Sequence, residues 1–174
     1  MTNIDWEFIH ELEGKGVTQG YHPTTNSGVT IASGFDLKEN NEVFCLAIGI
    51  DENIIEKLKP YFGLTGNHAK RFAETLELTE EEIDNIDECS RVFYAKDLER
   101  QYNSYDPIIS FDELDQGQAT VLVSVGFQYG KFSRTPTFIQ YATDGNWDAV
   151  YQELKDFGDN YSTRRNKEAE YLKN

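Results

Sequence analysis

The chain has 174 residues, of which 39% are hydrophobic and 13% aromatic, which is enough apolar side chain for a folded domain and argues against disorder. Its 31 acidic residues outnumber 16 basic ones, and the resulting charge of −15 argues against binding to nucleic acid phosphates or anionic membranes. No apolar run approaches the ~18 residues of a membrane span, so we expect no membrane insertion.

The N-terminal segment, MTNIDWEFIHELEG, is acidic and amphipathic rather than a secretory signal, so we expect a chain made without a signal peptide. Cys45 and Cys89 lack any metal-ligand spacing, and each is expected to be a buried apolar residue. The three histidines, His10, His22 and His68, are equally scattered. We therefore predict no metal site and no cofactor.

Residues 3–14 are predicted to form a helix with Asn3 as its cap and Gly14 at its end. Its apolar face consists of Ile4, Phe8, Ile9 and Leu12. Glu13 then falls in the last turn, where the helix dipole disfavours a negative charge. A carboxylate placed against this local preference is a candidate functional group.

The segment between Glu13 and Asp36 contains 22 residues and no Asp or Glu. Two short β-type runs, residues 17–19 and 27–31, lie among Gly, Thr, Ser, Asn and Pro, which predicts a hairpin or small sheet. Two carboxylates at the ends of a polar β-lobe suit acid/base hydrolysis of a sugar chain. A turn-rich surface excursion explains the same pattern equally well.

The rest of the chain is predicted to be mostly helical. Asp51 opens a helix that Pro60 stops, and the capping box Thr79–Glu82 introduces a long acidic helix. A second capping box, Ser110–Glu113, introduces the most apolar helix, expected to be the central core element. Further helices are predicted to start at Thr135-Pro136 and near Trp147.

With these elements in order, the sequence resembles the phage-type lysozymes. The matching motifs are Leu12-Glu13-Gly14, Gly20-Tyr21, Thr30-Ile31, Val125-Gly-Phe-Gln128-Tyr129, Asn146-Trp147-Asp148 and Thr163-Arg164-Arg165-x-x-Glu168. The resemblance implies a single α+β domain over residues 1–174, with a cleft between two lobes. A small β-lobe spans about 15–37, and a larger helical lobe spans about 38–174 and includes the helix 3–14.

Phage lysozymes usually carry a second acid soon after the tyrosine, where this chain has His22-Pro23-Thr24. The run Ser-Gly-Val-Thr30-Ile-x-x-Gly-Phe-Asp36 instead resembles the pesticin-like branch, which comprises bacterial toxins with a lysozyme-type domain. That resemblance implies a catalytic triad of Glu13, Thr30 and Asp36.

The resemblance further implies a muramidase that cleaves the β-1,4 bond between N-acetylmuramic acid and N-acetylglucosamine. Glu13 is expected to be a partly desolvated general acid, while Asp36 and Thr30 position a water for inverting hydrolysis, with the two carboxyls roughly 6.5–9.5 Å apart. Arg164 is expected to pair with the catalytic glutamate. Tyr21, His22 and Gln128 are expected to line the cleft and bind glycan.

Three alternatives remain open at this point: a lytic transglycosylase, a lysozyme-like domain that binds glycan without cutting it, and an acidic helical interaction module. The expected partner is the glycan strand of peptidoglycan, and a monomer is expected. The chain fits a phage endolysin, a secreted effector or a toxin domain, each acting on the cell wall or periplasm after phage lysis or non-classical secretion. For an effector, the resemblance implies an immunity protein that blocks the cleft.

Overall fold

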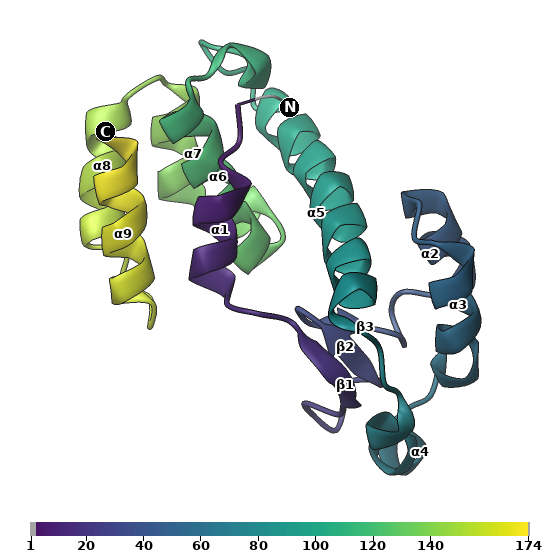
Figure 1. Ribbon diagram of the computed structural model, residues 1–174. Helices are drawn as coiled ribbons and strands as arrows, with labels where there is room; N and C mark the ends of the chain where they lie inside the picture. Colours follow the sequence, from purple (N-terminus) through teal and green to yellow (C-terminus); the bar gives the residue numbers. More distant parts are fainter. Residues whose placement is uncertain (1–2, 174) are drawn as a thin grey trace. The chain divides into compact units, whose positions relative to one another are not determined.

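The computed structural model describes residues 3–173 and has the predicted α+β class. The chain forms two compact units (Figure 1). We call Met1–Leu12 together with Tyr94–Asn174 the helical unit, and Glu13–Phe93 the sheet unit. Within the described residues, no helix is both long and apolar enough to cross a membrane.

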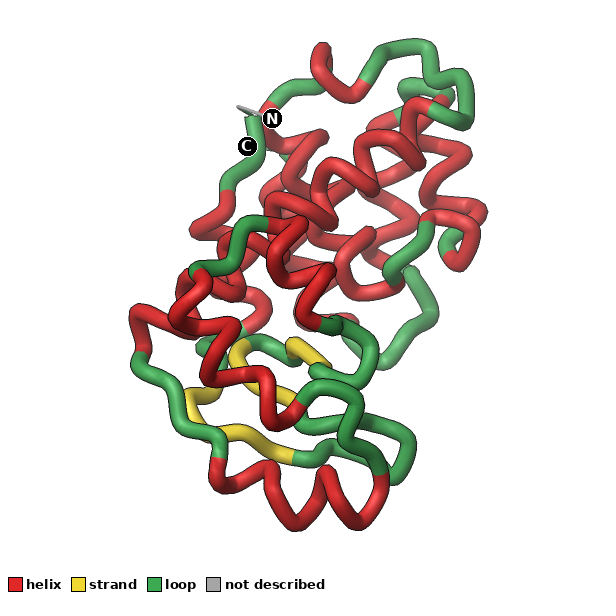
Figure 2. Tube along the Cα trace, turned by 90° about the vertical axis from the view of Figure 1, so that its right-hand side faces the viewer, coloured by secondary structure: helices red, strands yellow, loops and turns green. Residues whose placement is uncertain are grey.

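The sheet unit contains a three-stranded antiparallel sheet in the order β1-β2-β3 (yellow in Figure 2). Its strands are β1 (Val17–Tyr21), β2 (Thr30–Ala32) and β3 (Phe35–Asp36), and three short helices follow, α2 (Glu42–Ile48), α3 (Glu52–Leu58) and α4 (Gly66–Phe72). Asp51 occupies the position before α3, and Pro60 lies in the 3-10 turn that follows this helix, as predicted.

The sheet unit is larger than the predicted β-lobe of residues 15–37, because the helices after the sheet pack onto it. Apolar residues of the sheet region and of the helices form one buried cluster: Val29, Ile31, Phe35, Leu37, Cys45, Ile54, Ile55, Leu58, Ile83 and Ile86. Residues 38–93 were expected in the helical lobe and instead share a core with the strands. Since burial of apolar area drives packing, this shared core defines the unit.

The helical unit contains α1 (Trp6–Glu13) as far as Leu12 and the C-terminal part of α5 (Glu80–Asn103). It also contains α6 (Gln116–Tyr129), α7 (Pro136–Thr143), α8 (Trp147–Lys155) and α9 (Ser162–Leu172). In α6 every residue from 119 to 126 is buried, which confirms the prediction of a central core helix. A Cβ on Gly126 would lie 2.7 Å from the Leu98 side chain, so glycine lets α5 and α6 approach closely.

Two helices begin at residues other than those predicted. The first helix begins at Trp6 rather than residue 3, because Asp5, not Asn3, accepts the Phe8 N–H at 3.0 Å. The Asn3 amide donates to the Leu114 carbonyl oxygen at 2.8 Å instead.

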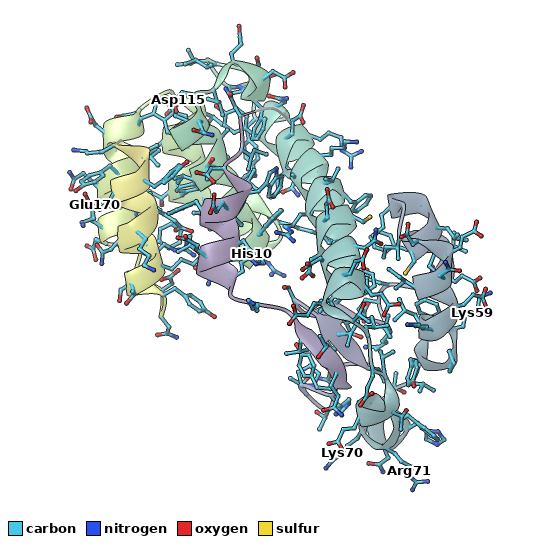
Figure 3. All side chains as sticks on the ribbon, in the orientation of Figure 1. His10, Lys59, Lys70, Arg71, Asp115 and Glu170 are labelled. Atoms are coloured by element: carbon cyan, nitrogen blue, oxygen red, sulfur yellow. The ribbon has the colours of Figure 1, made fainter. Side chains whose placement is uncertain are left out.

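The Ser110–Glu113 box forms, but it caps only a 3-10 turn, Phe111–Glu113. A further box introduces α6, in which Asp115 (labelled in Figure 3) accepts the Gln118 N–H at 2.8 Å. The predicted Thr79–Glu82 box at the start of α5 is confirmed by reciprocal hydrogen bonds of 2.9 and 3.2 Å.

Candidate active site

Three predicted site residues lie in one row across the sheet. Thr30 of β2 is paired in register with Tyr21 of β1 and with Asp36 of β3. Directly paired residues of neighbouring strands project from the same face of a sheet. The strands therefore bring a phenol, a threonine hydroxyl and a carboxylate together, with Thr30 at the centre.

Backbone N–H groups hold the Asp36 carboxylate in place. Gly28 N–H donates to its two oxygens at 3.0 and 3.2 Å, and Lys38 N–H donates to Oδ1 at 2.9 Å. A Cβ on Gly28 would lie only 2.7 Å from Asp36 Oδ1 and 2.6 Å from the Lys38 Cβ, so only glycine fits. In the sequence, Gly28 lies within the β-type run 27–31, and only the fold reveals the contact that requires glycine there.

The Thr30 side chain is buried, with 2% of its surface exposed, and its hydroxyl has no hydrogen-bond partner among residues 3–173. Most buried hydroxyls in proteins are satisfied, because an unmade hydrogen bond costs free energy. A buried hydroxyl beside a fixed carboxylate can bind a water molecule or a substrate hydroxyl.

Tyr21, a member of this row, is the last residue of β1, and His22 directly follows it. Desolvation and, secondarily, the charge of Asp36 raise the pKa of Tyr21, so its phenol stays a hydrogen-bond donor at neutral pH. His22 is half-buried, and its Nε2 has no hydrogen-bond partner within the described chain. Both residues therefore offer polar groups to a ligand, and their contact with glycan stays a prediction.

Glu13 is the last residue of α1, which confirms its predicted place in the final turn. Its side chain is exposed, and Gly14 follows it with a φ of 79°, a left-handed conformation that suits the end of a helix. The distance between the Glu13 and Asp36 carboxyls and the cleft between the lobes stay predictions.

Arg164 belongs to a buried polar network in the helical unit. Its Nε donates to Glu168 Oε1 at 3.1 Å, and its Nη2 donates to the backbone and side-chain oxygens of Ser124, both at 3.1 Å. Ser124 Oγ also donates to Glu168, which is fully buried. These contacts fix the guanidinium of Arg164, and its expected pairing with Glu13 stays a prediction.

Arg165 extends the same network toward Gln128. Its guanidinium donates to Glu168 Oε2, to Gln128 Oε1 and, at 2.9 Å, to Asp159 Oδ2. Gln128 was expected to bind glycan, and its amide oxygen is occupied by Arg165. Neither Glu168 nor Arg165 was predicted from the sequence to have a functional role. The sequence signal that could have found both is the adjacent arginine pair, which lies three and four residues before a glutamate. A buried charge requires a partner of opposite sign, and this spacing supplies one.

Among the described residues, no group of three or more His, Cys, Asp or Glu side chains is arranged to hold a metal ion.

The model of the pesticin family, described as a bacterial toxin homologue of phage lysozyme, C-terminal domain, matches residues 3–148. The fold and the matched segment define a phage-lysozyme-like toxin domain. The chain belongs to the pesticin family, which confirms the resemblance found in the sequence. A search of curated proteins finds no significant match.

Family membership implies a glycoside hydrolase acting on peptidoglycan. Glu13, Tyr21, Thr30, Asp36 and Gln128 all lie inside the matched segment, whereas Arg164 lies beyond its end.

Proposed function

We propose that the chain is an N-acetylmuramidase that cleaves the glycan strands of peptidoglycan with inversion. The observation that carries this proposal is the unpartnered Thr30 hydroxyl, which lies in register with the backbone-held carboxylate of Asp36. This pair has the polar groups needed to bind and orient one water molecule.

In the proposed reaction, Thr30 orients the water while Asp36 takes one of its protons as its oxygen attacks the anomeric carbon. Glu13 gives its proton to the glycosidic oxygen, so the C–O bond breaks as the new one forms. Glu13 is exposed in the free protein. Bound glycan would exclude water from its carboxyl group and so favour the protonated form that a general acid requires.

The remaining predicted residues have supporting roles in this proposal. Tyr21, His22 and the amide NH₂ group of Gln128 bind the glycan, and Arg164 supports the Glu13 carboxyl. The enzyme acts as a monomer on the cell wall, reached after phage lysis or non-classical secretion. If it serves as an effector, a cognate immunity protein blocks the cleft.

The test is lysis of purified cell walls. Glu13→Gln is expected to abolish lysis with the melting temperature nearly unchanged, and Asp36→Asn and Thr30→Ala to lose much of the activity. Full activity in Asp36→Asn would reject the assignment of the water-binding carboxylate.

The products then define the reaction. Proton NMR of the newly formed reducing end is expected to show the inverted anomer. Mass spectrometry is expected to show reducing sugars, whereas anhydro ends would identify a lytic transglycosylase. Walls that never lose turbidity would instead indicate a domain that binds glycan without cutting it.

A further inference from the structure

Asp87, on the N-terminal part of α5, carries a buried carboxylate that the proposed reaction does not use. Only 8% of its surface is exposed. Its Oδ1 accepts the Ser33 N–H at 3.1 Å, and its Oδ2 accepts the Ser33 hydroxyl at 2.7 Å. Burying a carboxylate is costly unless its oxygens are hydrogen-bonded, and here both oxygens bind one residue.

Ser33 lies at the tip of the turn that joins β2 to β3. The residue before it, Ala32, has a φ of 52° and is buried, and the residue after it, Gly34, has a φ of 96°. A left-handed conformation is unfavourable for alanine and persists only where the surroundings hold it in place. The two hydrogen bonds from Ser33 to Asp87 supply such a restraint.

This turn sets which residues of β2 and β3 face each other. The pairs Ile31 with Phe35 and Thr30 with Asp36 are both centred on Ser33. The register of a hairpin follows from its turn, and a slip of one residue moves each side chain to the opposite face. Fixing Ser33 therefore fixes the pairing of Thr30 with Asp36.

The segment that follows Glu13 packs against the same point. A Cβ on Gly16 would lie 3.0 Å from Asp87 Oδ2 and 2.9 Å from the backbone carbon of Ala32. Only glycine lets the chain pass this close. Asp87, the turn and the start of the β region thus form one tightly packed contact.

From these contacts we infer that Asp87 is a positioning residue that holds Thr30 opposite Asp36 by fixing the β2–β3 turn through Ser33. The inference rests on the proposed function for its catalytic consequence. Its structural part, the control of strand register by Asp87, stands independently of that function.

The experiment compares Asp87→Asn with Asp84→Asn, a control that makes the same chemical change at an exposed position of the same helix. Asparagine keeps the size of the side chain, but its NH₂ group cannot accept a bond from Ser33. Hydrolysis of soluble peptidoglycan glycan is measured as kcat and KM. Amide exchange of Leu37, whose N–H donates to the Val29 carbonyl oxygen at 2.9 Å, reports the hairpin register.

Asp87→Asn is expected to lower kcat about tenfold or more, since a small misplacement of catalytic groups is enough for such a loss, with KM within about twofold of wild type. Leu37 exchange is expected to accelerate, and Asp84→Asn to match wild type in every measurement. Ser33→Ala, which removes only one hydrogen bond, is expected to show a smaller effect of the same kind. In the Asp87→Asn background it is expected to add little. Ser33→Ala also serves as the test if Asp87→Asn does not fold.

Wild-type kcat together with wild-type Leu37 exchange in Asp87→Asn would overturn the inference. A change in KM with wild-type kcat would also overturn it. So would equally faster exchange at all amides, because that would indicate general destabilisation. If the wild-type chain hydrolyses no glycan, the proposed function fails. Leu37 exchange then still decides whether Asp87 controls the pairing of Thr30 and Asp36.

Discussion

At the residue scale, the buried Thr30 hydroxyl links stability to activity. A buried polar group without a hydrogen-bond partner destabilises the folded state by about 1–3 kcal/mol. We therefore predict that Thr30→Val, which keeps the side-chain shape, leaves the free energy of unfolding unchanged or higher while wall lysis falls sharply. Chemical denaturation and wall turbidity measure the two effects.

Thr120 provides the matched control. It is also buried, but its hydroxyl oxygen accepts the Asp5 N–H at 2.8 Å. Thr120→Val leaves that donor unpaired and is expected to lower the free energy of unfolding by about 1–3 kcal/mol. A loss of stability in Thr30→Val as large as in Thr120→Val would contradict the assignment of Thr30 as a ligand-binding hydroxyl.

Residue positions were predictable where local rules apply. The place of Glu13 at the end of a helix follows from the apolar pattern and from Gly14. The pairing of Thr30 with Asp36 depends on a turn containing an alanine of positive φ, which no propensity rule anticipates. Asp87 was one acid in a long acidic run, and only its packing against Ser33 sets it apart.

At the scale of elements, the start of α6 depends on Asp115. The Asp115 carboxylate accepts the Gln118 N–H, and the Gln118 side chain accepts the Asp115 N–H at 3.1 Å. Because α6 is the central helix of its unit, fraying of its first turn should weaken the whole unit. We predict that Asp115→Ala lowers the free energy of unfolding by about 0.5–2 kcal/mol, as measured by urea denaturation.

Ser110→Ala tests the other box in the same assay. Ser110 caps only the short turn Phe111–Glu113 and is exposed, so its loss should cost less than that of Asp115. Equal costs for the two variants would contradict this ranking and show that the Ser110 turn stabilises the unit as much as the cap of α6 does.

Helices with caps and periodic apolar residues were predictable, whereas the strands were only partly so. The helices that begin near Thr79, Thr135 and Trp147 match the expected starts. The third strand, Phe35–Asp36, is too short to show any alternation of apolar and polar residues. The Ser110–Glu113 box was mistaken for the start of α6, because Ser110-x-x-Glu113 and Asp115-x-x-Gln118 obey the same rule only five residues apart.

At the scale of the whole molecule, the acidic composition makes the response to low pH depend on particular carboxylates. Hydrogen bonds from the Tyr171 hydroxyl and the Phe8 N–H lower the pKa of Asp5. The pKa of Tyr171 is raised to about 12 by desolvation and by Asp5, so its hydroxyl remains a donor across the acid range. A carboxyl whose pKa is lower when folded stabilises the protein above its unfolded pKa, about 3.9, and this contribution is lost as pH falls through the folded value.

We therefore predict that Asp5→Asn is less stable than wild type at pH 6 and that the difference narrows as the pH falls below about 4. Thermal unfolding across this range measures the effect. Asp112→Asn, at an exposed position in the same unit, is the control. A difference from wild type that stays constant with pH would show that Asp5 acts through packing rather than through its charge.

The class and family of the molecule were predictable from ordered motifs, but its division into units was not. The helices after the sheet have ordinary amphipathic patterns, and their local sequence does not indicate which apolar surface they cover. Their burial with Val29, Ile31 and Leu37 is a tertiary result. The family match shows similarity of sequence, and it does not identify which charged residues are buried.

The arginine network bears on where the folded domain ends. The family match stops at residue 148, yet Ser124 and Gln128 inside it bind charged groups supplied by α9. A chain trimmed at residue 148 would leave Ser124 and Gln128 without these hydrogen-bond partners. The segment that the family model matches is therefore shorter than the stretch of chain that supplies this buried network.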